Sequence, residues 1–366
     1  MGMWSSREDL NVAQLLAVLV TCAIFCAIWI ILKPRGFVVQ LCTCCFVLSL
    51  VCTQLLMKEL ASTVKFRYPA IVTSLHFLSV WIVAWIFWAF HGELLVRCNP
   101  ASLGSSRRFF TFVLPIAASL PLSIVFNNTS LLYMGAGLAG VVGTMAPIVT
   151  AILTHFLGRR ISRHGWIGVL VATCGASFIA FGEADPGKED GLVLLGLMFC
   201  TMSVFLRAVK AVLQDQLLQP AAYSSRSDLE KGIQPLGSQE ALTPMHVWAL
   251  TAPPCTLLAL AYAFTTESFE SALQEVTPTS GAFVLTSCFS ATVLNILGLM
   301  SVKQLGASSM QIVGKLNTIV LLALSMGFWG ESMPKEVLVG TCFALMGVAI
   351  FERGGSMRPA KLSQPS

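Results

Sequence analysis

The feature that most constrains this chain is a succession of long apolar blocks, each close to the ~20 residues that a helix needs to cross a bilayer. Two of them, 191–213 and 304–330, are apolar apart from Arg207, Lys210 and Lys315. The others carry no Lys, Arg, Asp or Glu and fall at 13–32, 37–57, 69–90, 109–129, 131–157, 165–182, 246–264, 281–302 and 337–351. The sequence therefore predicts an all-α polytopic membrane protein.

The composition leaves little material for anything outside the membrane. Only 11% of the residues are charged and 55% are hydrophobic, whereas soluble domains are about 25% charged. The one sizeable polar segment, 214–245, is too short for a catalytic domain, and the chain has no phosphate-binding loop, dinucleotide glycine pattern or HExxH motif. The twelve cysteines show no zinc-binding spacing. We therefore expect no enzyme activity, no cofactor, no metal and no nucleic-acid partner.

The basic residues indicate the orientation in the membrane. With the C-terminus in the cytosol, fourteen Lys and Arg lie on the cytosolic side and six on the other. This distribution obeys the positive-inside rule. The exception is the cluster from Lys58 to Arg67, on the non-cytosolic side.

Glycines that recur at one fixed offset suggest an internal duplication. Gly158 and Gly330, Gly168 and Gly340, and Gly175 and Gly347 are each separated by 172 residues, as are Phe156 and Phe328. The prediction is a five-helix repeat at 37–183 and a second at 184–353, the latter containing the polar loop 214–245. An N-terminal segment, 1–36, adds one helix, and 354–366 forms a disordered cytosolic tail. Because five is odd, the repeats are inverted, an arrangement typical of transporters with a site near the midplane.

Three cations inside the apolar blocks point to the ligand. Arg207, Lys210 and Lys315 have no acidic residue within those blocks. An ionisable group in the membrane is costly unless it has a function, and a positive cavity without counter-ions suits an anion. Lys315 is near the middle of its block, on one helical face with other polar residues, namely Ser308, Gln311, Thr318 and Ser325. Such a stripe lines a cavity or contacts another helix, and the lysine favours the cavity.

Other polar residues have two interpretations each. Arg207 and Lys210 stand near the cytosolic end of their block, where they could bind a ligand or extend to the surface. Asn295 could bind a ligand or a neighbouring helix. His76 and Tyr133 are more typical of hydrogen-bonded core residues than of ligand contacts. Two overlapping glycosylation sequons at Asn127 and Asn128 lie at a helix end, where modification is not expected.

Several stretches resemble the triose-phosphate and nucleotide-sugar transporters of the drug/metabolite transporter superfamily. The resemblance runs from about Cys42 to Glu352. It rests on Lys58 followed by Phe66-Arg67-Tyr68-Pro69, Thr73 and His76, on Asn128-Thr129-Ser130-Leu131, on Gly143-Thr144-Met145-Ala146-Pro147, on Arg207-Ala208-Val209-Lys210-Ala211-Val212-Leu213-Gln214, on Ala252-Pro253, on Asn295, and on Gln311-Ile312-Val313-Gly314.

The resemblance implies ten core helices and the exchange of a phosphorylated sugar or nucleotide sugar for phosphate or a nucleotide monophosphate. We predict an antiporter that exchanges a nucleotide sugar for a nucleotide monophosphate by alternating access. The resemblance also favours Arg207, Lys210 and Lys58 as substrate-binding residues. We therefore predict that Lys315, Arg207, Lys210 and Lys58 bind the phosphates and that Gln311, Asn317, Thr318 and Asn295 contact the sugar or base. The resemblance also implies a Golgi or ER membrane. The chain departs from the family where many members read G-N-x-K, because Lys315 and Asn317 have exchanged places.

Alternatives to this function remain open. Plastid phosphate translocators tend to carry a lysine where this chain has Gly143, which disfavours a triose phosphate. The FYNN pattern of GDP-mannose carriers is missing from 246–264, so a UDP-sugar is the leading hypothesis. The runner-up is a sugar-phosphate/phosphate translocator of a plastid-type membrane, and a third reading is a membrane scaffold with the transporter fold and no transport. Whether the unit is a monomer or a homodimer stays open.

Overall fold

The computed structural model of the 366-residue chain describes residues 7–90, 109–133, 139, 142–159, 161–182, 193–219, 242–329 and 335–354. Two short elements, the 3-10 turn Lys33–Arg35 and the π-helical turn Phe109–Val113, precede longer helices. The α-helices are α1 (Arg7–Leu32), α2 (Phe37–Ser62), α3 (Pro69–Phe90), α6 (Leu114–Tyr133), α8 (Ala146–Phe156), α9 (Arg163–Gly182), α10 (Val193–Leu218), α12 (Pro244–Thr266), α13 (Phe269–Gln274), α14 (Pro278–Leu305), α15 (Ala307–Gly314), α16 (Leu316–Trp329) and α17 (Lys335–Gly354). Residues 220–241 and 355–366, from the expected polar loop and tail, lie outside the described part.

The helices have the length and composition of membrane spans. In the described ranges seven are long and apolar enough to cross a bilayer, and the shorter apolar helices Ala146–Phe156 and Val339–Phe351 accompany them. Local sequence sets their ends: Thr243 and Thr277 cap α12 and α14 in capping boxes, each followed by proline at the first helical position. The chain is a polytopic helical membrane protein, as the sequence predicts.

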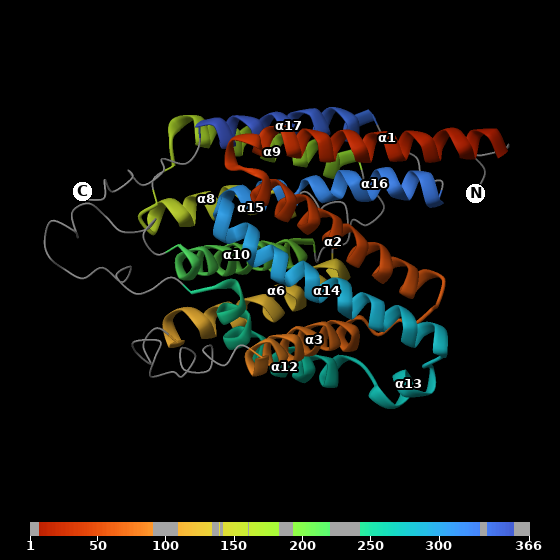
Figure 1. Ribbon diagram of the computed structural model, residues 1–366. Coiled ribbons are helices and arrows are strands. Elements are labelled where there is room, and N and C mark those ends of the chain that lie inside the picture. Colours follow the sequence, from red (N-terminus) through yellow and green to blue (C-terminus); the bar gives the residue numbers. More distant parts are fainter. Residues whose placement is uncertain are drawn as a thin grey trace, which may run out of the picture.

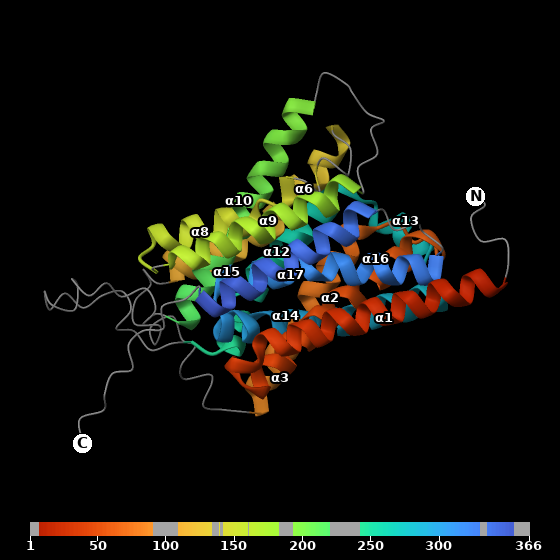
Figure 2. The ribbon, with the colours of Figure 1, turned by 90° about the horizontal axis from the view of Figure 1, so that it is seen from above.

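The bundle has two opposite edges, each made of one closely packed helix pair. Helices α9 and α17 form one edge and α3 and α12 the other (Figure 1). Between these edges α2 packs on α14, α6 packs on α10, and α8 contacts both α10 and α15. In the view from above, α6 and α10 lie on the side away from α1 (Figure 2). The interior between the two edge pairs is where polar side chains from several helices can meet.

The N-terminal helix α1 is packed into the fold. It runs alongside α16 in both views (Figures 1 and 2). Its residues Ile24, Ile28 and Leu32 are buried in the largest apolar cluster, which also includes residues of α2, α9, α16 and α17. The Gln40 amide nitrogen of α2 donates to the Trp29 carbonyl at 2.6 Å. A helix with this buried face is an integral part of the bundle.

Glycine brings α9 and α17 into backbone contact. A Cβ placed on Gly168 would lie 2.6 Å from the Phe351 nitrogen, and one on Gly175 would lie 2.6 Å from the Gly340 carbonyl oxygen. On the other helix, a Cβ on Gly347 would lie 2.3 Å from the Ala172 nitrogen. Small residues permit such close approach of membrane helices. Four of the glycines that recur at the 172-residue offset therefore make this one interface.

Helix α10 extends further than the sequence suggested. It continues to Leu218, so Gln214 to Leu218 are helical instead of forming the start of the polar loop. The expected boundary was wrong because Gln214, Asp215 and Gln216 ended the apolar block, although Leu217 and Leu218 are buried. The extension moves Arg207 to the middle of its helix and away from the end, where it would reach the surface.

The extended end of α10 carries a buried ion pair. The Asp215 side chain is fully buried and accepts from the guanidinium of Arg159, which follows α8 and is 15% exposed. The same guanidinium covers Gly306, where an added Cβ would lie 2.7 Å from both terminal nitrogens. Gly306 has φ +87°, a conformation that favours glycine, and it separates α14 from α15. Arg159 therefore links the ends of three helices.

Candidate substrate-binding site

Two helical segments are interrupted, and a lysine connects the interruptions. Helix α15 ends at Gly314 and α16 begins at Leu316, so Lys315 lies at the break between them. On the other side, a turn at Thr144 and Met145 precedes α8. The Lys315 ammonium donates to the Gly143 carbonyl at 2.8 Å across a separation of 172 residues, the offset of the proposed duplication. Interrupted helices at corresponding positions of two halves are a pointer to a transporter's binding site.

Space lies beside both interruptions. A Cβ added to Gly143 or to Gly314 would meet no atom within 4 Å. These glycines therefore do not serve close helix packing, unlike those of α9 and α17. The missing side chains leave room beside the backbone at the point where the two segments meet, which is suitable for a ligand.

Two more cations, Arg207 and Lys210, lie on α10, and Arg207 is within electrostatic reach of Lys315. The Arg207 guanidinium repels both the Lys315 and the Lys210 ammonium. One terminal nitrogen of Arg207 donates to the Asn127 amide oxygen of α6 at 3.4 Å, while its Nε has no hydrogen-bond partner. For Lys210 the described residues supply no hydrogen bond or ion pair. Arg207 thus interacts with both lysines, and donors of Arg207 and Lys210 are left without a partner among the described residues.

No carboxylate balances these three cations within the described ranges. A Lys or Arg at the centre of a membrane helix costs about 2.5–3.5 kcal/mol on insertion scales. The ion pair between Arg159 and Asp215 lies at the helix ends and involves none of the three. Cations that repel one another do not stabilise the fold, but they can bind an anion through charge-assisted hydrogen bonds.

The polar residues around Lys315 point in different directions. Asn317 in the first turn of α16 is buried, and its amide nitrogen donates to the Gln54 amide oxygen of α2 at 2.8 Å. Lys315 and Asn317 have exchanged places relative to the G-N-x-K pattern, and in this order the Lys315 ammonium points toward Gly143 and the Asn317 amide toward α2. Gln311 is half-buried one turn before the break. Thr318 follows in the first turn of α16, and its side chain lies outside the described part.

Other predicted site residues lie elsewhere or are engaged in packing. The Asn295 amide nitrogen donates to the Ala291 carbonyl of its own helix at 2.8 Å. Lys58 lies near the end of α2. His76 shares a 3.0 Å hydrogen bond with Ser287, and Tyr133 stacks on Phe199 with centroids 6.1 Å apart. His76 and Tyr133 thus pack as core residues.

Two residues of the site were not predicted from sequence. Asn127 was interpreted as part of a glycosylation sequon at a helix end, but α6 continues to Tyr133 and directs the amide at Arg207. Gln54 lies within an apolar block, where an amide needs a partner. The sequence could have identified both residues, because a polar amide inside a membrane helix, like a charge there, marks a candidate functional site.

A polytopic helical bundle with interrupted helices and a cationic interior defines the class of secondary transporters. The sequence model of the Triose-phosphate Transporter family matches residues 37–352. The chain belongs to this family, which confirms the resemblance found in the sequence. It is therefore a transporter and not an enzyme.

Similar proteins are known at low sequence identity. A probable sugar phosphate/phosphate translocator of Arabidopsis thaliana is 23% identical over 306 residues, covering 81% of this chain and 77% of the relative. UDP-uronic acid transporter 1 of Arabidopsis thaliana is 24% identical over 306 residues, covering 81% and 89%. One solved crystal structure aligns with a TM-score of 0.61 at 14% identity, covering 85% of this chain and 95% of the other. The last comparison shows a shared fold.

Proposed function

We propose that this protein is an antiporter that exchanges a nucleotide sugar, specifically a UDP-sugar, for a nucleotide monophosphate by alternating access. The observation that carries the proposal is the bond from Lys315 to Gly143, which joins two helix interruptions beside the uncompensated cations of α10. A diphosphate between these cations would neutralise their mutual repulsion. The name of one relative, a UDP-uronic acid transporter, supports this substrate class.

Each polar residue has a part in this proposal. Arg207, Lys210 and Lys315 bind the phosphates as charge-assisted donors, and Lys58 attracts the anion near one end of α2. A second group, Gln311, Asn317 and Thr318, contacts the sugar or base. Asn295 contacts the sugar or base through its amide oxygen, because only its amide nitrogen donates within its own helix.

The proposed movement is that of two inverted halves, 37–183 and 184–353. Two observations support this division: the interruptions at Gly143 and Lys315 have the same offset as the recurring glycines, and those glycines pair α9 with α17. The loaded carrier reorients more easily than the empty one, because the anion compensates the interior charge. The proposed location is a Golgi or ER membrane, and colocalisation of the tagged protein with organelle markers tests it.

Exchange in proteoliposomes tests the function. Vesicles loaded with UMP should take up labelled UDP-sugar, and external UMP should compete more strongly than inorganic phosphate. Lys315→Ala should abolish uptake while thermal stability is retained, since removal of an uncompensated cation does not weaken the fold. Lys303→Ala, which removes an exposed cation at the end of α14, is the matched control and should transport normally. Normal uptake by Lys315→Ala would disprove the assignment of this site.

The second candidate is a sugar-phosphate/phosphate translocator of a plastid-type membrane. The relatives that carry this name favour it. Competition decides between the two: inhibition by inorganic phosphate and a sugar phosphate, without inhibition by UMP, would replace the first proposal by the second. No stabilisation by any of these anions in a thermal-shift assay would favour the scaffold reading.

A further inference from the structure

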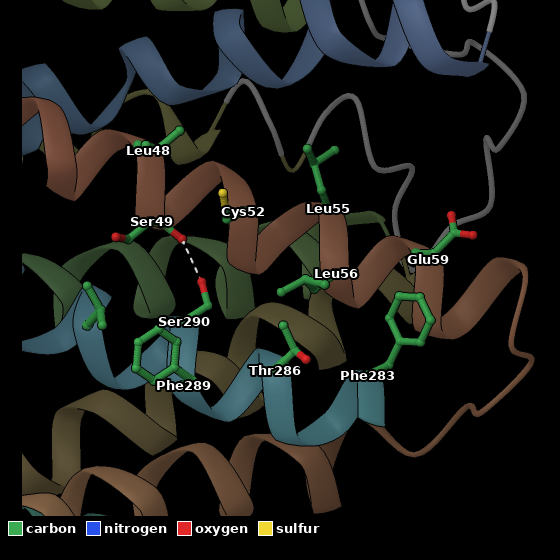
Figure 3. A pocket seen from close by; sticks show the side chains of 11 residues that line it. Leu48, Ser49, Cys52, Leu55, Leu56, Glu59, Phe283, Thr286, Phe289 and Ser290 are labelled. Carbon is green, nitrogen blue, oxygen red and sulfur yellow. Dashed lines mark hydrogen bonds between the residues drawn. The ribbon is translucent and has the colours of Figure 1, made fainter. Parts of the chain in front are cut away.

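A surface groove between α2 and α14 is separate from the cationic site. It has a volume of about 600 Å³ and is lined mainly by apolar side chains from one face of each helix (Figure 3). Leu48 and Phe289, which line it, are 51% and 72% exposed, so the groove opens to the surface of the bundle. Both helices are membrane spans, and this surface therefore faces lipid.

Two of the three hydroxyl groups that line the groove, those of Thr286 and Ser290, are already hydrogen-bonded within the protein. The Thr53 hydroxyl of α2 donates to the Ser49 carbonyl at 2.8 Å, so the Ser290 hydroxyl of α14 is the donor in its 2.8 Å bond to the Thr53 oxygen. The Ser290 hydroxyl also lies 3.4 Å from the Ser49 carbonyl, as the dashed line in Figure 3 shows. Thr286 donates to the Ala282 carbonyl at 2.8 Å. A wall whose polar groups bond to one another does not require a polar ligand. The walls therefore suit an apolar chain.

One end of the groove differs from the rest. Glu59 and Phe283 flank this end in Figure 3. For the Glu59 carboxylate, the described part of the chain offers no hydrogen bond or ion pair. It lies in the last turn of α2, where the helix dipole is also negative, so both contributions favour a cation. The face of a phenylalanine ring attracts an ammonium group as well.

The dimensions fit one lipid tail. From Leu48 to Glu59 the helix rises about 16 Å at 1.5 Å per residue, which is close to one half of the ~30 Å hydrocarbon core. The apolar part of the groove thus extends from near the middle of the bilayer to its boundary, and Glu59 marks the boundary. A second protein copy would not need a groove of this length with a single charged end.

We propose that this groove binds one acyl chain of a phospholipid with a primary ammonium headgroup, such as phosphatidylethanolamine. The tail lies between α2 and α14, and the ammonium contacts the Glu59 carboxylate beside the Phe283 ring. The lipid packs against both helices at once and stabilises their contact. This site does not depend on the transported substrate.

Native mass spectrometry of the delipidated full chain in detergent tests the proposal. Phosphatidylethanolamine should form a one-to-one adduct and raise the melting temperature, whereas phosphatidylglycerol of the same chain length should not. Glu59→Gln should weaken phosphatidylethanolamine binding about tenfold, equivalent to 1.4 kcal/mol. Glu270→Gln removes an exposed carboxylate of α13 and should leave binding unchanged.

A second pair of variants tests the position of the tail. Cys52→Trp fills the groove and should remove the adduct, while Leu257→Trp adds the same side chain at an exposed position of α12 and should not. Equal binding of the two lipids, or equal binding to wild type and Glu59→Gln, would overturn the proposed headgroup site. An adduct retained by Cys52→Trp would overturn the groove as its location. Dimers that form through this face in place of lipid binding would also refute the proposal.

Discussion

The ion pair between Arg159 and Asp215 should account for a large share of the stability at its end of the bundle. Breaking a buried pair by removing one partner costs about 3–5 kcal/mol, because a charge remains in a dry environment. The two partners are not equally buried: Asp215 is fully buried, and Arg159 is 15% exposed. Arg159→Met leaves the more deeply buried charge and should cost about 5 kcal/mol, while Asp215→Leu should cost about 3 kcal/mol.

A double-mutant cycle separates the pair from its surroundings. Replacing both residues, by Arg159→Met with Asp215→Leu, should restore most of the stability, since apolar substitutes for a buried pair are often neutral. The free energy of unfolding is measured by denaturant titration in detergent micelles. Arg163→Met, at an exposed arginine a few residues along the chain, is the control and should change little. Additive single effects, or an Arg159→Met cost equal to that of the control, would refute the reasoning.

Three other predictions follow from packing and capping. Gly347→Ala should destabilise the protein by about 1–3 kcal/mol, because the added Cβ would overlap the backbone of α9. Gly281→Ala, whose Cβ would meet no atom within 4 Å, should stabilise it by up to about 1 kcal/mol. Thermal unfolding of both variants in micelles measures the difference. Asn127→Ala should raise the half-saturation concentration for exchange several-fold by releasing Arg207, with unfolding unchanged. Glu267→Gln should cost about 1 kcal/mol in a denaturant titration, because the carboxylate accepts from two backbone N–H groups at the start of α3.

The spans could be predicted from sequence because the bilayer imposes a simple requirement on each of them. A helix that crosses hydrocarbon needs a sufficient run of apolar residues, and hydropathy detects that run directly. The helix break at Lys315 could not be predicted in this way. Gly314, Lys315 and Leu316 are all compatible with a continuing helix, and the Lys315 N–H still bonds to the Ile312 carbonyl at 3.1 Å. The interruption is a small change of hydrogen-bond pattern that composition does not reveal.

The cations of the site were accessible from sequence, but their partners were not. A charge in an apolar block is visible without any structure, so Arg207, Lys210 and Lys315 were identified as candidates. Where each side chain points depends on how helices distant in the sequence pack. The contacts of Lys315 with Gly143 and of Asn317 with Gln54 join residues that are 172 and 263 positions apart. Periodicity within one helix contains no information about such neighbours.

The backbone contact between α9 and α17 has a consequence for motion. Most helix interfaces consist of side chains, which can change rotamer and allow one helix to slide past the other. At Gly168, Gly175 and Gly347 there is no side chain to rotate, and the opposing atoms belong to the main chain. We therefore expect this edge of the bundle to keep its geometry while other interfaces rearrange. It would act as the fixed axis of the molecule, and the distance that any helix travels would increase with its separation from that axis.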